Sequence, residues 1–156
     1  MKKIKSALIS VSDKSNLKPL LKILKKNNIN LISSGGTFKT IKKLKFKCTE
    51  VADYTGFKEI LGGRVKTLHP KIHAGILSKR NNKSHVKELK KNNFENIDLI
   101  IVNFYPFEET IEKTNNMNKI IENIDIGGPT MVRAAAKNYD DVTIITSTNQ
   151  YAELIN

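Results

Sequence analysis

Short apolar runs alternate with stretches of helical spacing from the N-terminus onward. SALISV, at residues 6–11, is a mostly apolar run with the length of a strand. Four leucines between Leu17 and Leu24 then recur at helical spacing, which predicts a helix with one buried face. Ser12 or Asp13, just before that pattern, is the expected N-cap.

The alternation continues through the first third of the chain. Residues 30–33 predict a second strand, which ends in the polar sequence SSGGT. Thr37 is the expected start of a short amphipathic helix whose apolar positions run to Leu44. Residues 48–51 are a candidate third strand.

The middle of the chain holds its least regular and its most regular pattern. Residues 56–80 are punctuated by glycine and predict loops or short helices, whereas residues 85–91 predict a solvated surface helix. The apolar run 97–102, interrupted only by Asp98, is typical of a central parallel strand that is covered on both faces. Residues 107–123 are then mainly helical in pattern.

The same pattern extends to the end of the chain. Pro129 follows a glycine pair and predicts a helix start, residues 142–146 predict another buried strand, and a last helix begins near Asn149. Strands that alternate with helices predict an α/β fold, a Rossmann-like three-layer sandwich with a mainly parallel sheet. No linker or repeat interrupts the pattern, so we expect one domain over residues 1–156.

The composition indicates which partners and which cellular compartment to expect for such a domain. The formal net charge is +12, but lysine is spread along the whole chain and there is no tryptophan to stack on bases. We therefore expect no specific nucleic-acid partner, although the charge favours an anionic metabolite. Cys48 is the only cysteine, and no signal peptide or long apolar run is present, which predicts a cytoplasmic protein without a membrane span.

Polar and glycine residues follow the predicted strands, at the edge where open parallel sheets bind their ligands. Ser12 and Lys14 follow the first strand, SSGGT follows the second, and Asn103 and Tyr105 follow the central one. The glycines of SSGGT let backbone N–H groups approach a ligand, and the helix start behind them favours an anion. A flexible turn with a threonine cap is the alternative interpretation.

The stretch GGRVKTLHPKIHAGIL, residues 62–77, concentrates basic side chains. Arginine is rare in this lysine-rich chain, and Arg64 offers a planar, two-pronged donor. If the piece is extended, Arg64 and Lys66 project to the same side and suit one anion. Its two histidines are four residues apart, but Pro70 biases the first away from helical geometry and no third ligand is near. We therefore expect no metal site.

DIGGP is the second unusual segment. Asp125 precedes two glycines and a predicted helix N-terminus, whose backbone donors can stabilise a developing oxyanion. Lys137 lies a little over two turns beyond Pro129 if that helix is regular. It is either part of a site or a cation that the dipole favours at the helix C-terminus.

Five segments together resemble one enzyme family: ALISVSDKSNL, ISSGGTFKTI, GGRVKTLHPKIHAGIL, IVNFYPF and DIGGPTMVRAAAKN. They are similar to the N-terminal domain of the bifunctional purine biosynthesis enzyme, which combines IMP cyclohydrolase with AICAR formyltransferase. The resemblance covers nearly the whole chain. It implies a methylglyoxal-synthase-like α/β fold, in agreement with the fold predicted from the pattern.

The resemblance implies the reaction that closes the second purine ring. In the phosphorylated nucleotide formyl-AICAR, the carboxamide nitrogen attacks the formyl carbon and water leaves to give IMP, the last step of de novo purine biosynthesis. An amide nitrogen is a poor nucleophile, so proton removal, oxyanion support and proton delivery to the departing oxygen must be arranged. No cofactor is implied for this step; 10-formyltetrahydrofolate serves only the formyltransferase domain, which lies outside these residues. A homodimer is implied as well.

The resemblance also assigns roles to individual residues. Those implied to handle protons are Lys66, Tyr105, Asp125 and Lys137. Those implied to surround the nucleotide are Ser12, Lys14, Ser34, Gly36, Thr37, Arg64, Lys66, Thr67, Asn103, Asp125, Ile126, Gly127 and Gly128.

Several alternatives stay open. The family's cyclohydrolase part extends beyond a point such as Asn156, so the chain is an excised piece, a natural stand-alone form or a truncated one. Methylglyoxal synthase, a phosphate lyase, shares the fold and a similar glycine loop, but GGRVKTLHP and NFYPF favour the cyclohydrolase. A phosphate-sensing regulatory domain of the same fold is another alternative, and it needs none of the four proton-handling residues.

Overall fold

Five parallel strands form the centre of the computed structural model, which describes residues 3–155. In sheet order they are β3 (Thr49–Glu50), β2 (Asn30–Ser33), β1 (Ser6–Val11), β4 (Leu99–Asn103) and β5 (Thr143–Ile145). The central strand β1 pairs in register with both neighbours, and Leu8 lies opposite Ile32 on β2 and Ile100 on β4. The predicted α/β fold with a parallel sheet is confirmed.

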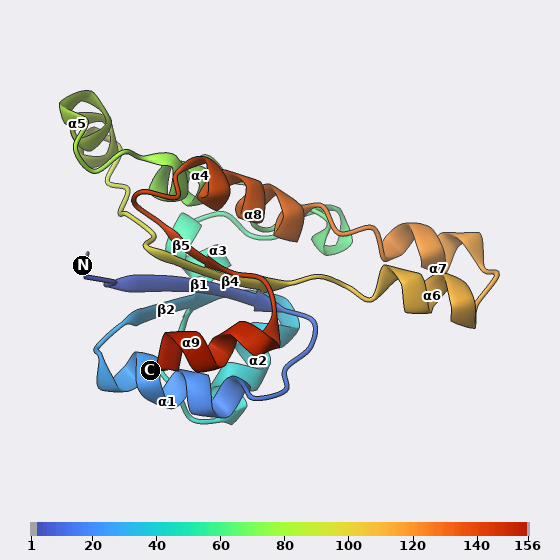
Figure 1. Cartoon of the computed structure of the whole chain (residues 1–156). Coiled ribbons are helices and arrows are strands. Elements are labelled where there is room, and N and C mark those ends of the chain that lie inside the picture. The colour runs from blue at the N-terminus through green and yellow to red at the C-terminus, as the bar shows by residue number, and fades with distance from the viewer. Residues whose placement is uncertain (1–2, 156) are drawn as a thin grey trace.

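Helices cover both faces of this sheet, which gives the three layers of Figure 1. One face carries α1 (Leu17–Lys26), α2 (Gly35–Lys43) and α9 (Tyr151–Ile155), and the other carries α3 (Val51–Thr55), α4 (Pro70–Leu77) and α8 (Gly127–Lys137). Helix α5 (Lys83–Lys91) lies outside these layers, and α6 (Phe107–Lys113) and α7 (Met117–Glu122) project beyond the carboxyl end of β4. Two short 3-10 turns complete the order, η1 (Leu61–Gly63) and η2 (Thr148–Gln150).

Successive residues of the central strands enter two different cores. On β1, Ala7 and Ile9 pack with the leucines of α1, whereas Leu8 packs with α4 and α8 on the opposite face. All three side chains are fully buried. This two-sided burial explains why the strand sequences are continuously apolar rather than alternating. Each fully buried aliphatic side chain contributes about 1.5–3 kcal/mol to folding.

The start of α1 differs from the sequence-based expectation. Neither Ser12 nor Asp13 caps it; the N-cap is Asn16, which is left-handed (φ 56°) and makes no side-chain capping bond. The Asp13 carboxylate instead accepts hydrogen bonds from the backbone N–H and the hydroxyl of Ser15. These bonds lower the pKa of Asp13. The prediction was wrong because this local turn captures the carboxylate before the helix begins.

Other boundaries shift by one or two residues. Helix α2 begins at Gly35 rather than at Thr37, whose hydroxyl is bonded to β1 instead. The third strand is shorter than residues 48–51 because Val51 already begins α3. The glycine pair before Pro129 lies inside the first turn of α8, not in a preceding turn.

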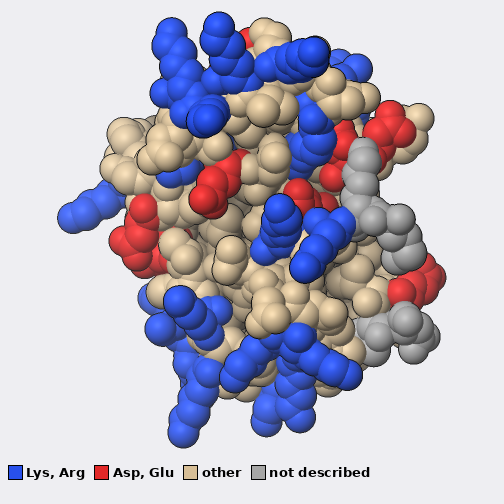
Figure 2. Space-filling model, turned by 90° about the vertical axis from the view of Figure 1, so that its left-hand side faces the viewer, with Lys and Arg blue, Asp and Glu red and all other residues tan. Residues whose placement is uncertain are grey.

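Basic side chains are spread over the surface. In Figure 2 many of them lie near α5 at the top and α1 at the bottom, and the band between holds both acidic and basic side chains. Helix α1 ends in Lys25 and Lys26 and α5 ends in Lys90 and Lys91, positions that the helix dipole favours for cations. Among the described residues, none of the helices has the length and hydropathy of a membrane span.

Alanine substitutions at two helical glycines should change the free energy of unfolding in opposite directions. At Gly75 in α4 an added Cβ would lie 2.7 Å from the backbone oxygen of Glu95, whereas at Gly36 in α2 nothing lies within 4 Å. We expect Gly75→Ala to lower the free energy of unfolding by about 1–3 kcal/mol. Gly36→Ala should raise it by about 0.5 kcal/mol, because alanine is the better helix former. Urea denaturation measures both, and a Gly75→Ala chain of wild-type stability would contradict the close docking of α4.

Candidate functional site

The carboxyl ends of the strands open into a cavity of about 660 Å³. Its walls come from the β1–α1 loop, the start of α2, the segment around η1, the end of β4, and the connection from α7 to α8. Small-molecule sites commonly enclose about 300–1,000 Å³, so a mononucleotide fits this volume.

Nearly all of the predicted site residues line this cavity. The structure brings together Ser12, Lys14, Ser34, Gly36, Thr37, Arg64, Lys66, Thr67, Asn103, Tyr105, Asp125, Ile126, Gly127 and Gly128. Segments that lie more than a hundred residues apart in the sequence therefore meet at one edge of the sheet, as the polar strand ends predicted.

Lys137 is the exception. It is exposed at the last residue of α8, whereas the cavity is lined by Gly127 and Gly128 at the first turn of the same helix. Eleven helical residues span about 15 Å, which separates the two ends. The adjacent Asn138 is buried and donates to the backbone oxygens of Ile76 and Ser78, so this end of α8 docks on α4. The position fits the interpretation of Lys137 as a cation at a helix C-terminus.

The cavity also contains residues that the sequence analysis did not assign to it: Ser10, Val11, Gly35, Gly62, Gly63, Ile121, Glu122 and Ile124. The three glycines belong to motifs already singled out, so their motif positions could have predicted them. Glu122 carries no such signal, because its partner Arg64 lies 58 residues away in the chain.

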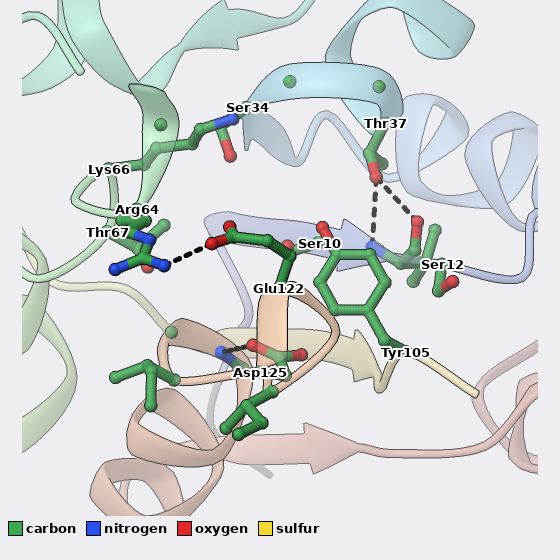
Figure 3. Close-up of a pocket in the computed structure, with 18 of the residues that line it drawn as sticks. Ser10, Ser12, Ser34, Thr37, Arg64, Lys66, Thr67, Tyr105, Glu122 and Asp125 are labelled. Atoms are coloured by element: carbon green, nitrogen blue, oxygen red, sulfur yellow. Dashed lines mark hydrogen bonds and ion pairs between the residues drawn. The ribbon is translucent and has the colours of Figure 1, made fainter. Parts of the chain in front are cut away.

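Hydrogen bonds of the Thr37 side chain hold the start of α2 against the end of the central strand β1. Its hydroxyl donates to the backbone oxygen of Val11 at 2.9 Å and accepts from the Val11 N–H at 3.0 Å (Figure 3). The side chain is buried, so both bonds are shielded from water. The first turn of α2 is thereby held against the cavity.

Asn103 shapes the loop that carries Ser12 and Lys14. Its side-chain oxygen accepts from the N–H groups of Ser12 (2.6 Å) and Asp13 (2.9 Å), and its amide nitrogen donates to the Asp13 backbone oxygen. Lys14 Nζ donates to the Ser12 backbone oxygen at 3.0 Å. Asn103 therefore shapes this loop, and its amide nitrogen keeps a second N–H on the cavity side of the sheet for a ligand.

The side chain of Lys66 occupies space that two glycines leave open. An added Cβ at Gly63 would approach its Cε to 2.7 Å, and one at Gly35 would lie 3.4 Å from its Nζ. Both glycines have positive φ, +92° and +54°, which other residues rarely adopt. Lys66 Nζ also pairs with a carboxylate oxygen of Glu59 at 3.0 Å. The lysine is thus placed beside the start of α2 (Figure 3).

The expected extended geometry around Arg64 is wrong. Arg64 has helical φ and ψ after η1, because Ile60 and Val65 bridge to each other and close a tight turn. Arg64 and Lys66 still line the same cavity. The Arg64 guanidinium forms a hydrogen-bonded ion pair with Glu122. That bond raises the pKa of Arg64 and lowers the pKa of Glu122.

Asp125 organises the start of α8. Its Oδ1 accepts from the Gly128 N–H at 2.9 Å, and a Cβ at Gly128 would lie 2.6 Å from its Oδ2. A Cβ at Gly127 would lie 2.6 Å from Thr67 Oγ1. Both glycines are therefore required by close approach to a site side chain. One of the expected oxyanion donors, the Gly128 N–H, is already occupied by Asp125.

Tyr105 stands at the cavity mouth with 53% of its surface exposed. Figure 3 shows its ring between Ser12 and Glu122. It also borders a second, mainly apolar hollow with Phe104, Phe107 and Pro129. The phenol can therefore reach a ligand without displacing a buried contact.

The two histidines of the basic stretch support the loop rather than face a common ligand. His69 is the N-cap of α4, and its Nδ1 accepts from the Lys71 N–H at 3.1 Å. His73 is half-buried and hydrogen-bonds to the Thr67 backbone. In the described part of the chain, no group of three histidine, cysteine or acidic side chains could hold a metal ion.

Three comparisons relate the chain to known proteins. Residues 16–130 match the family model described as MGS-like domain. Proteins named "Bifunctional purine biosynthesis protein PurH" are similar: that of Prochlorococcus marinus (strain NATL2A) is 58% identical over 96% of this chain, and that of Acetivibrio thermocellus is 52% identical over 97%. The chain spans about 29% of the length of these relatives. A solved structure described as "Crystal structure of ForH" has a TM-score of 0.84 and 30% identity, covering 97% of this chain and 78% of that one.

The contact between Gly127 and Thr67 can be tested with a double-mutant cycle. Gly127→Ala should destabilise the fold by about 1–2 kcal/mol, because its Cβ meets Thr67 Oγ1. In a Thr67→Ala background, which removes that oxygen, the same substitution should cost about 1 kcal/mol less. Urea denaturation of the four proteins measures the coupling, and strictly additive effects would contradict the contact.

The burial of His73 predicts a pH dependence of stability. Burial lowers its pKa below the ordinary 6.5, so the unfolded state takes up a proton at a higher pH than the folded state. Stability should therefore fall as the pH drops below about 6.5, and the fall should be smaller in His73→Gln. His85→Gln, on the exposed helix α5, leaves His73 in place and should keep most of the drop. Urea denaturation at pH 7.5 and 5.5 tests this, and equal drops in wild type and His73→Gln would contradict it.

Proposed function

The chain belongs to the MGS-like domain family, and from this premise we propose that it is an IMP cyclohydrolase domain of a bifunctional purine biosynthesis protein. Its reaction is the closure of formyl-AICAR to IMP with loss of water. The main observation behind this proposal is the cavity. Its lining combines anion-binding groups with an amine, a phenol and a carboxylate from distant segments of the chain. The high identity to relatives named as purine biosynthesis proteins supports the same assignment.

The nucleotide phosphate binds at the start of α2. Ser34 precedes two glycines at the N-terminus of that helix, where backbone N–H groups lack intrahelical partners and attract anions. Lys66 Nζ lies beside Gly35, and Arg64 lines the same cavity. A dianionic phosphate thus meets backbone donors, an ammonium group and a guanidinium group together.

The heterocycle lies between the phosphate cradle and the start of α8. The carboxamide nitrogen loses one proton as it attacks the formyl carbon, and the formamide nitrogen loses a second. Both protons leave with the former formyl oxygen as water. The Lys66 amine, the Tyr105 phenol and the Asp125 carboxylate, which all line this cavity, are the groups that we assign to these transfers. The reaction involves no net oxidation or reduction, so the proposal includes no cofactor; 10-formyltetrahydrofolate would serve a separate formyltransferase domain.

We also propose that the chain acts as a homodimer. Apolar side chains of α6 and α7, which form the projecting hairpin, are exposed outside the cavity, including Ile111 and Met117. A second copy could cover them, which would remove about 25 cal/mol of unfavourable hydration per Å². Sedimentation equilibrium tests this, and a monomer at micromolar concentration would contradict it.

The activity can be tested directly by ultraviolet absorbance. The wild-type chain should convert formyl-AICAR to IMP and should not release phosphate from dihydroxyacetone phosphate, the substrate of methylglyoxal synthase. The reverse result would support the lyase alternative. Binding of the nucleotide without turnover would support a sensing domain.

Two lysines provide a matched pair of variants. Lys66→Ala should lower the rate of IMP formation by about 10²–10⁴, the usual contribution of one proton-transferring group. Lys137→Ala removes the same charge at the far end of α8 and should stay within a few-fold of wild type. Circular dichroism checks that both variants remain folded. If folded Lys137→Ala loses as much activity as Lys66→Ala, then Lys137 has the role that the family resemblance implies. In that case the cavity is not the complete site.

A further inference from the structure

We propose that Glu122 is an internal competitor for Arg64: its carboxylate occupies the guanidinium group that a phosphate-bearing ligand needs, and so sets the affinity for that ligand. The proposal rests on the proposed function only in taking the ligand to carry a phosphate. No motif points to Glu122, and it reaches the site only through the fold.

The pair spans the cavity between two separate elements. Arg64 follows η1, Glu122 is the last residue of α7, and both side chains line the cavity (Figure 3). The guanidinium nitrogen Nη2 donates to Glu122 Oε1. A carboxylate presents to this guanidinium the same kind of oxygen acceptors that a phosphate would present. Glu122 therefore occupies the position of an anionic ligand.

The other acidic groups near the cavity do not compete in this way. Asp125 also lines it, but its carboxylate accepts the Gly128 N–H and is engaged with α8. Glu59 pairs with Lys66, yet Glu59 does not line the cavity, so a ligand can reach the ammonium group without displacing it. Of these two ion pairs, only Arg64–Glu122 has both members in the cavity lining, so a phosphate that binds the guanidinium group through two oxygens competes with the carboxylate for Nη2.

The exposure of the pair makes this competition reversible. The side chains of Arg64 and Glu122 are 62% and 58% exposed, and solvent-exposed ion pairs are worth only about 0.2–1 kcal/mol. A phosphate dianion binds a guanidinium group through two oxygens and carries more charge, so it can displace the carboxylate. The hydrogen bond from Arg64 also lowers the pKa of Glu122, which keeps the competitor ionised near neutral pH. Glu122 thus weakens binding without blocking it.

Titration with inorganic phosphate at constant ionic strength tests the proposal. Glu122→Gln should tighten phosphate binding about fivefold, since it removes an opposing interaction of the size of an exposed ion pair. Glu112→Gln is the matched control: it removes one negative charge from the same hairpin, on the exposed face of α6 and outside the cavity. It should change the Kd by less than about twofold, because Glu112 lies outside the cavity and solvent and salt screen exposed charges that make no direct contact.

A second pair of variants isolates the role of Arg64. In an Arg64→Gln background, Glu122→Gln should gain no more than the Glu112→Gln control, because the contested guanidinium is gone. The proposal is overturned if Glu122→Gln matches the control in the wild-type background, if its gain persists without Arg64, or if it weakens binding. A Glu122→Gln chain that fails to fold, or phosphate binding that no variant shows, would overturn it as well.

The outcomes also separate this inference from the proposed function. A chain that forms no IMP but gains phosphate affinity on Glu122→Gln would remove the cyclohydrolase assignment and leave the competition intact. A chain that forms IMP with no specific effect of Glu122→Gln would do the reverse.

Discussion

The parallel pairing of β1 with β4 and β2 is the constraint on which the rest of the structure depends. It sets Val11 opposite Asn103, so the two strands end side by side and their following loops meet. Two side chains then secure this edge: Thr37 bonds both backbone groups of Val11, and Asn103 bonds the loop after β1. Without this register, the glycine loop of α2 and the start of α8 would have no common cavity to line.

The cavity is built largely from close approaches that only glycine permits. The missing Cβ leaves space for the Lys66 side chain at Gly63, for Thr67 at Gly127 and for Asp125 at Gly128. Each of these glycines belongs to a motif noticed in the sequence, but the reason for it is a contact with another segment. Two of the three described cations that line the cavity are paired with a carboxylate, Lys66 with Glu59 and Arg64 with Glu122, whereas Lys14 donates to a backbone oxygen. Of the two carboxylates, only that of Glu122 lines the cavity and competes with an anionic ligand.

Sequence reasoning failed where a polar group had two possible partners. Asp13 was expected to cap α1, but it bonds Ser15 in a local turn. Thr37 was expected to open α2, but its hydroxyl is bonded to Val11. By contrast, Pro70 correctly indicated that His69 is not helical, because a proline restricts the residue before it whatever surrounds them. Local steric rules hold in isolation, whereas hydrogen-bond partners are decided by what lies nearby in space.

The sequence by itself determined the alternation of strands and helices, the parallel sheet and the edge at which most of the site gathers. Burial periodicity and chain direction are local properties. In a parallel sheet they predict that Ser12 and Ser34, which follow strands, and Asn103, which ends one, lie at the same edge. Only the tertiary structure decided which charges meet across that edge. It paired Arg64 with Glu122 over 58 residues of chain. Such a contact follows from the packing of separate elements, which no motif encodes.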